Sequence, residues 1–367
     1  MGPVAEVGAY FLRLGTIGFG GPTAHIAAMH DDLVGRRAWI DERRFLEVVG
    51  VTNLIPGPNS TEVAVHLGYL RAGVPGGIAA GLAFMVPAFL MVLALSWVYF
   101  ESGPFRLRED VLAGIQPVAL AAVLGASWRL RSAVIGGWRK PVLGAAGLGL
   151  TIVLPLLTPV WLLAAGLFAM LTSQPWTATA LVVPAPLATV GLSGLPGLAW
   201  VFLRTGLLLF GGGLVLVPLL APEVVARGWL SEAAFLDGVA LGQATPGPIV
   251  MTAAFVGYAV AGVPGAVVAS VAIFLPSFVA VLAGSGPFLR RFRDRPAVAA
   301  FVEGVTAAAL GAILASAVLL AEAALAGPVR IAIFVLALAA ILLRAPVALV
   351  VLAGALLGAG GGAVGLT

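Results

Sequence analysis

Two arginines lie inside long apolar segments, and each follows a Phe-Leu pair. Arg13 belongs to the stretch 11–21 and Arg204 to the stretch 202–212. An ionisable side chain within an apolar membrane segment is costly and by default marks a functional site. Two guanidinium groups on related elements would bind a divalent oxyanion, because each planar group donates paired hydrogen bonds to such oxygens. The alternative is that both side chains reach the membrane interface and bind nothing.

Closely spaced glycines follow each arginine. The first copy has Gly20 and Gly21 before Pro22, and the second has Gly211 and Gly212. Glycine allows positive φ and close backbone approach. A broken helix also exposes N–H groups at the positive end of its dipole, where anions bind. We therefore expect these residues to contribute to an anion site, although small residues also serve plain helix packing.

A Pro-Gly-Pro motif occurs twice and interrupts an apolar segment each time. Proline cannot continue a helix because it lacks the N–H group. Polar amides stand beside each motif, so we expect the two motifs and these amides to contact the anion. The alternative is a bend that binds no ligand. The predicted contacts are Asn53, Pro56, Gly57, Pro58 and Asn59 in the first copy, and Gln243, Pro246, Gly247 and Pro248 in the second.

Three further side chains could carry protons. Glu62 and His66 are four residues apart and would share one helix face, and His25 follows the first glycine cluster. Histidine and desolvated glutamate both titrate near neutral pH. Glu62 could instead pair with an arginine or face a water-filled vestibule. With no cysteine and three histidines in 367 residues, we expect neither a metal site nor a cofactor.

The elements that must hold these residues are membrane helices. Hydrophobic residues make up 61% of the chain and charged residues 10%, against about 25% charged in soluble domains. No Asp, Glu, Lys or Arg occurs in 141–203 or 238–289, and each stretch is long enough for several spans. The net charge of +4 then reflects basic loops and not nucleic-acid binding. The expected class is an all-α polytopic membrane protein.

The chain contains an internal repeat. Residues 11–22 and 202–213 are identical at 7 of 12 positions, and residues 68–76 and 257–265 at 7 of 9. The Pro-Gly-Pro motifs fall between these pairs in the same order. We therefore predict two repeats, 1–185 and 190–367, joined by the uncharged stretch 173–197.

The basic residues indicate that the two repeats have opposite topology. Three loops carry four Lys or Arg each: 29–44, 284–297 and 128–140. Their repeat partners carry one, two and one: 222–237, 101–110 and 322–330. Because Lys and Arg mark cytoplasmic loops, the reversal in all three pairs predicts inverted-topology repeats.

An odd number of spans in each repeat is required for inversion. We predict about five per repeat, plus one re-entrant hairpin around each Pro-Gly-Pro motif, at 45–70 and 235–260. The predicted spans are 4–28, 74–100, 111–128, 141–157 and 159–172, then 198–221, 262–284, 301–321, 329–343 and 345–362.

The ordered motifs resemble the chromate transporter (CHR) family, in its long, fused two-repeat form. The resemblance rests on Phe-Leu-Arg-Leu-Gly with Phe-Gly-Gly-Pro, on Pro-Gly-Pro-Asn at 56–59 and on Arg-Ala-Gly at 71–73. The resemblance implies chromate export across the plasma (inner) membrane of a prokaryote. It also implies that Arg13, the Gly18–Pro22 turn and Pro56–Asn59 are functionally important. The second copy departs from the pattern where Gly213 replaces Pro22 and Ile249 replaces Asn59.

The expected function is therefore secondary transport of chromate, or of a related tetrahedral oxyanion such as sulfate. The chain has no nucleotide-binding Gly-x-x-x-x-Gly-Lys motif and none of the common hydrolase motifs, so we expect neither an ATP-driven pump nor an enzyme. An anion channel and a protein that handles lipid phosphate are the alternatives. The expected partners are the oxyanion, membrane lipid and, as an open possibility, a second copy in a homodimer.

Overall fold

The computed structural model describes residues 2–101, 106–173, 193–284 and 295–363, and within these ranges it contains helices and turns but no β-strand. Five of the helices are long and apolar enough to cross a membrane. The expected all-helical, multi-spanning class is thereby confirmed. Most of the predicted connection 173–197 lies outside the described residues.

The helices of the first half follow one another with short connections; α marks an α-helix, η1 is a π-helix, and the other η elements are short 3₁₀-helices. They are α1 (Pro3–Ile17), α2 (Gly21–His30), η1 (Asp31–Arg36), α3 (Glu42–Thr52), α4 (Asn59–Glu101), α5 (Arg106–Arg129), η2 (Arg131–Val134), α6 (Arg139–Val153), η3 (Pro155–Leu157) and α7 (Thr158–Thr172).

The second half repeats this order with small changes. Its helices are α8 (Gly194–Leu207), η4 (Gly213–Val215), α9 (Leu216–Ala226), α10 (Glu232–Ala244), η5 (Ile249–Met251), α11 (Thr252–Gly284), α13 (Pro296–Leu319), α14 (Ala321–Ala324), α15 (Pro328–Leu342) and α16 (Val347–Ala363).

The predictions of single spans at 4–28 and 198–221 were wrong, because the first is broken into α1 and α2 and the second into α8, η4 and α9. In the first half α1 ends at Ile17 and α2 begins at Gly21, after Gly20 adopts a φ of 108°. In the second half α8 ends at Leu207 and the chain turns through two glycines before η4. Of the other eight predicted spans, six each overlap one helix, whereas 141–157 overlaps α6 and η3, and 301–321 overlaps α13 and the first residue of α14.

Helices α4 and α11 are both sharply kinked at repeat-equivalent residues. Gly73 has a φ of 64° and Gly262 a φ of 58°, so neither position is helical. The two limbs of α4 lie against each other, since a methyl group built on Gly68 would meet the backbone of Gly76. Each kinked helix is therefore a helical hairpin. Whether the residues around the Pro-Gly-Pro motifs re-enter the membrane stays a prediction.

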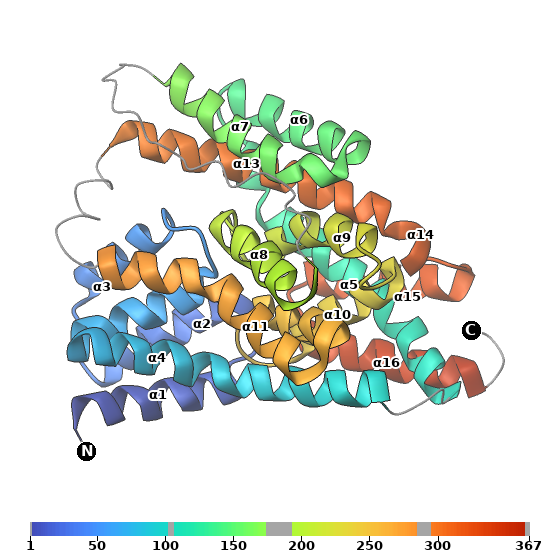
Figure 1. Cartoon of the computed structure of the whole chain (residues 1–367), viewed down its shortest axis with the longest axis horizontal. Coiled ribbons are helices and arrows are strands. Elements are labelled where there is room, and N and C mark those ends of the chain that lie inside the picture. The colour runs from blue at the N-terminus through green and yellow to red at the C-terminus, as the bar shows by residue number, and fades with distance from the viewer. Residues whose placement is uncertain (1, 102–105, 174–192, 285–294, 364–367) are drawn as a thin grey trace.

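The two halves exchange packing partners. Helix α13 of the second half packs on α6 and α7 of the first, and α5 of the first half packs on α15 and α16 of the second. Figure 1 shows α13 running beside α6 and α7 along one edge of the molecule, with α1 beside α4 along the opposite edge. These contacts come in matched pairs, while the opposite orientation of the repeats in the membrane remains a prediction.

Candidate functional site

A cavity of about 490 Å³ lies where the two glycine-rich breaks meet the two Pro-Gly-Pro turns. Its wall comes from both halves and includes many of the residues predicted from the sequence. Those that line it are Gly20, Gly21, Pro22, Asn53, Gly57, Asn59, Gly211, Gly212, Gln243 and Gly247.

Two reciprocal hydrogen bonds join the halves at this cavity. The N–H of Gly247 donates to the carbonyl of Gly18 at 2.9 Å, and the N–H of Gly57 donates to the carbonyl of Leu209 at 3.0 Å. Gly18 and Leu209 are repeat-equivalent, as are Gly57 and Gly247. Each Pro-Gly-Pro turn therefore closes on the break of the opposite half.

Six glycines of the cavity wall adopt positive φ. They form three repeat-equivalent pairs: Gly20 with Gly211, Gly21 with Gly212, and Gly57 with Gly247. At Gly247 the requirement is double, because φ is 92° and a methyl group would lie 2.8 Å from Cβ of Ala88. Only glycine meets both conditions without strain.

Two α-helices begin at the cavity wall, and so do two single 3₁₀ turns, η4 and η5, which lead directly into α9 and α11. α2 begins at Gly21, α4 at Asn59, η4 at Gly213 and η5 at Ile249, and all four residues line the cavity. The first-turn N–H groups of a helix have no partner within the helix, and they carry the positive end of its dipole. The backbone thus directs positive potential into the cavity from both halves.

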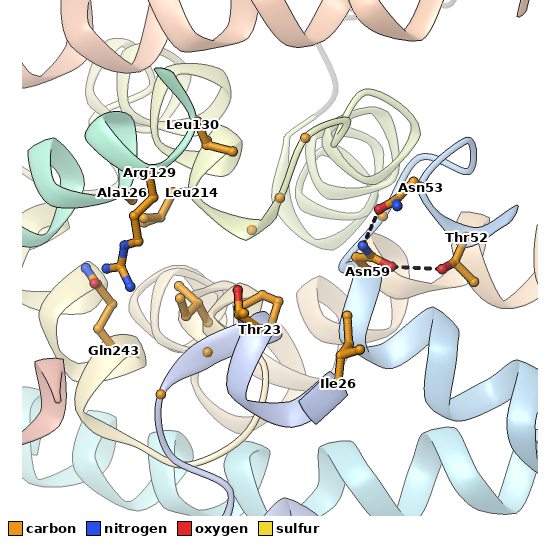
Figure 2. A pocket seen from close by; sticks show the side chains of 18 of the residues that line it. Thr23, Ile26, Thr52, Asn53, Asn59, Ala126, Arg129, Leu130, Leu214 and Gln243 are labelled. Carbon is orange, nitrogen blue, oxygen red and sulfur yellow. Dashed lines mark hydrogen bonds between the residues drawn. The ribbon is translucent and has the colours of Figure 1, made fainter. Parts of the chain in front are cut away.

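The cation at the cavity is Arg129, the last residue of α5. Figure 2 shows its guanidinium directed toward the side-chain amide of Gln243. Among the described residues no carboxylate lies within 4 Å of this guanidinium, and the Nε2 group of Gln243 is buried with no hydrogen-bond partner. No Asp or Glu is among the lining residues. The cavity therefore offers unused donors and no acidic group to repel an anion.

The sequence did not single out Arg129. It belongs to the basic loop 128–140, where Lys and Arg were counted as markers of orientation. The available signal was its position directly after the predicted span 111–128, which puts it at a helix end and not in the middle of a loop.

The two arginines predicted to supply the charge do not line this cavity. Arg13 is an exposed residue of α1. Arg204 is buried, 3% exposed, and its guanidinium is 2.6 Å from the carboxylate of Glu223. Glu223 also pairs with Arg227 at 2.7 Å. The guanidinium of Arg204 is therefore held between α8 and α9 by a carboxylate that it shares with Arg227, because a buried cation is retained where a buried anion pairs with it.

The polar side chains of the first Pro-Gly-Pro turn bond to one another. The side-chain amide of Asn59 donates to the side-chain oxygen Oδ1 of Asn53 and accepts from the hydroxyl of Thr52 at 2.9 Å (Figure 2). These bonds join the end of α3 to the start of α4. The four prolines of the two motifs do not line the cavity, and they act instead by ending the helices before it.

His25 lies behind the first break and holds it in place. Its Nε2 is 2.9 Å from the carbonyl of Gly18, and its Nδ1 is 3.4 Å from the hydroxyl of Ser60. A carbonyl can only accept, so Nε2 carries the proton and Nδ1 accepts from Ser60. Both ring nitrogens of the neutral histidine are thus used in structural contacts.

Glu62 and His66 follow on the first limb of α4. Both are buried, at 1% and 8% exposure, and neither lines the cavity. The carboxyl group of Glu62 lies beside Gly57, a residue of the cavity wall, since a methyl group on that glycine would meet Oε1 of Glu62. The described residues include no cluster of three or more side chains suited to a metal ion.

The chain matches the family model described as chromate transporter, once over residues 5–188 and again over residues 197–359. The two matches together span nearly the whole chain. None of the solved structures matches it.

Several curated relatives are similar over most of their length. A chromate transport protein of Cupriavidus metallidurans is 37% identical over 85% of this chain and 81% of its own. A probable chromate transport protein of Synechococcus elongatus is 34% identical over 86% and 84%. A chromate transport protein of Pseudomonas aeruginosa is 33% identical over 86% and 80%.

Proposed function

Because this chain belongs to the chromate transporter family, we propose that it exports chromate, or a related tetrahedral divalent oxyanion such as sulfate, through the cavity between its two breaks. A multi-pass transporter of this kind is not an enzyme. One observation carries the proposal: the cavity joins Arg129, which pairs with no acidic group among the described residues, to four helix starts, and no carboxylate of the described residues lines it.

In the proposed site, Arg129 supplies the formal charge and Gln243 one directed N–H group. The glycines of the two breaks supply backbone N–H groups, and their positive φ lets the backbone approach the anion closely. A tetrahedral dianion presents four oxygens that point in different directions. Hydrogen-bond donors placed on several sides of the cavity can therefore contact more of these oxygens than two planar guanidinium groups alone. The assignment of Arg13 and Arg204 to the anion stays a prediction, and in this conformation neither reaches the cavity.

The proposed driving force is the membrane potential. Moving one elementary charge is worth about 2.3 kcal/mol per 100 mV. A dianion leaving an inside-negative cell through the plasma membrane would therefore gain about twice that amount. Export needs no nucleotide under this condition, in agreement with the absence of a nucleotide-binding motif in the sequence.

The test is exchange of labelled chromate in proteoliposomes preloaded with unlabelled chromate, sulfate, phosphate or chloride. We expect Arg129→Gln to raise the half-saturating chromate concentration about 10- to 100-fold, because a charge-assisted hydrogen bond contributes about 1.5–3 kcal/mol. Arg131→Gln is the matched control, since Arg131 lies two residues on and stacks on Trp128 outside the cavity. Equal loss in both variants would contradict the proposed site.

The same vesicles separate the alternatives. A carrier accelerates labelled uptake when unlabelled anion is present inside, whereas a channel does not require the internal anion. The direction of transport is then measured in intact cells, where export by the natively oriented protein should lower chromate accumulation and raise chromate resistance. A homodimer also stays a prediction, to be checked by the mass of the purified protein in detergent.

A further inference from the structure

Glu62 is buried without any partner. Its side chain is 1% exposed, and neither carboxyl oxygen has a hydrogen-bond partner among the described residues. Other acidic groups of these residues are paired: Glu223 with two arginines, Glu6 with Arg71, and Asp32 with Arg36. An isolated buried carboxylate is so costly that the group takes up a proton instead.

The carboxyl group lies directly behind the cavity wall. A methyl group on Gly57 would collide with Oε1 of Glu62 on one side and with Ser277 of α11 on the other. Gly57 itself lines the cavity and donates its N–H to Leu209 of the opposite half. One glycine therefore separates this acid from the proposed anion site and from the contact between the halves.

The charged groups on the surrounding elements leave Glu62 uncompensated. Helix α11 carries no Asp, Glu, Lys, Arg or His, and it faces the carboxyl group with Ser277, whose hydroxyl donates to Phe274. On α2, His25 is held by Gly18 and Ser60. On α1, Arg13 is exposed. The charged side chains of α3 are exposed or half-buried near its start, and His66 lies one turn along α4 itself.

We propose that Glu62 is a proton-binding site, and that a proton and the oxyanion occupy the protein together and cross the membrane together. The inference rests on the function proposed above. An anion in the cavity strengthens the attraction of the nearby carboxylate for a proton, and the neutral acid in turn removes the repulsion that a carboxylate would exert on the anion. The proton is taken from water on one side, forms the carboxylic acid, and is returned to water on the other side with the anion.

The site is single, although the fold is repeated. The repeat-equivalent of Glu62 is Thr252, whose hydroxyl donates to the carbonyl of Ile249 and cannot take up a proton near neutral pH. We therefore expect one proton to be carried with each dianion, so that the net charge moved across the membrane in each cycle is 1− instead of 2−.

The experiment compares wild type, Glu62→Gln and Glu62→Asp in proteoliposomes. External protease first inactivates the copies inserted in one orientation, so that only copies in the other orientation are assayed. Each protein is assayed for chromate exchange at equal pH and for chromate accumulation driven by an acidic exterior. Wild type and Glu62→Asp should accumulate chromate in response to the pH difference. Glu62→Gln, which keeps the shape of the protonated acid, should retain exchange within about twofold and lose the response to the pH difference.

Glu42→Gln, on the exposed start of α3, is the matched control and should behave as wild type in both assays. A pH-driven accumulation that survives in Glu62→Gln would overturn the proposal, as would a wild type that exchanges chromate but ignores the pH difference. A wild type that exchanges neither chromate nor sulfate would instead contradict the proposed function, and the proton proposal with it. Uptake of one proton from weakly buffered detergent solution on adding chromate, absent in Glu62→Gln, is the second readout.

Discussion

The side chains of Arg204, Glu223 and Arg227 form a charged group between α8 and α9. Replacing Arg204 by Ala would leave a buried carboxylate with one partner in place of two. We expect this variant to lose roughly 3 kcal/mol of stability, the usual size of the loss when a buried ion pair is broken on one side. Thermal unfolding in detergent would measure it as a lower melting temperature, with the chromate affinity of the folded fraction unchanged.

Arg13→Ala is the matched control, because Arg13 occupies the equivalent position in the first half and is exposed. Its melting temperature should remain near that of wild type. The double variant Arg204→Met with Glu223→Leu should recover part of the lost stability, since an apolar pair can replace a buried ion pair at little cost, while the partly exposed Arg227 exchanges its carboxylate partner for water. If folded Arg204→Ala instead needs a higher chromate concentration for half-saturation, Arg204 takes part in anion binding.

At the residue scale, the sequence predicted the backbone of the cavity better than its charge. Gly20, Gly57, Gly211 and Gly247 were identifiable because a glycine repeated in two copies has few roles besides an unusual backbone conformation. An arginine has two outcomes in an apolar segment, binding a ligand or pairing with an acid. The sequence alone does not fix which partner a helix face meets, so Arg204 was assigned to the anion and Arg129 was not.

At the scale of the elements, the Pro-Gly-Pro turns depend on their glycines. We expect Gly247→Ala to destabilise the protein by about 1–3 kcal/mol and to impair transport, because alanine at a φ of 92° is strained and its methyl group would crowd Ala88. The measurements are thermal unfolding and chromate exchange.

Gly149→Ala on α6 serves as the comparison, since nothing lies within 4 Å of the added methyl group. It should be neutral or stabilising by up to about 1 kcal/mol, as expected for glycine replaced by alanine in a helix. Similar losses in both variants would show that the turn has no special requirement for glycine.

The glycine clusters predicted broken helices, although 4–28 and 198–221 were still drawn as single spans. Residues 4–28 and 198–221 stay apolar across the break, and hydropathy alone therefore continues through it. The break depends on the glycines adopting positive φ, and on N–H groups of the opposite half donating backbone hydrogen bonds to the carbonyls of Gly18 and Leu209. Such long-range support is invisible in a single stretch of sequence.

At the scale of the whole molecule, the two repeats are predicted to face opposite sides of the membrane. The chain lacks cysteine, so single cysteines can be introduced directly. Glu42→Cys and Glu232→Cys occupy equivalent, exposed positions at the starts of α3 and α10. A membrane-impermeant thiol reagent should label them from opposite sides. Labelling from the same side would contradict the inverted repeats.

A proton carried with the anion would also change the balance of forces on the whole molecule. With one net charge moving, a potential of 100 mV favours export by about 2.3 kcal/mol instead of about 4.6. An exterior more acidic by one pH unit opposes the outward proton by about 1.4 kcal/mol. Export would then remain favourable at moderate acidity and slow as the exterior becomes more acidic, which measurements of chromate efflux from cells across external pH can check.

The exchange of packing partners between the halves has a consequence for how the chain is made. In the apolar stretch of α5, 72% of the residues are buried, and its neighbours α15 and α16 are synthesised about 200 residues later. Gly114 of α5 packs so closely on the backbone of Gly354 that lipid cannot fill the same space. Until α15 and α16 are made, the face of α5 that they later cover is in contact with lipid. This differs from the usual order, in which N-terminal domains complete their folding first. The first repeat can therefore reach its final packing only after α15 and α16 have been synthesised.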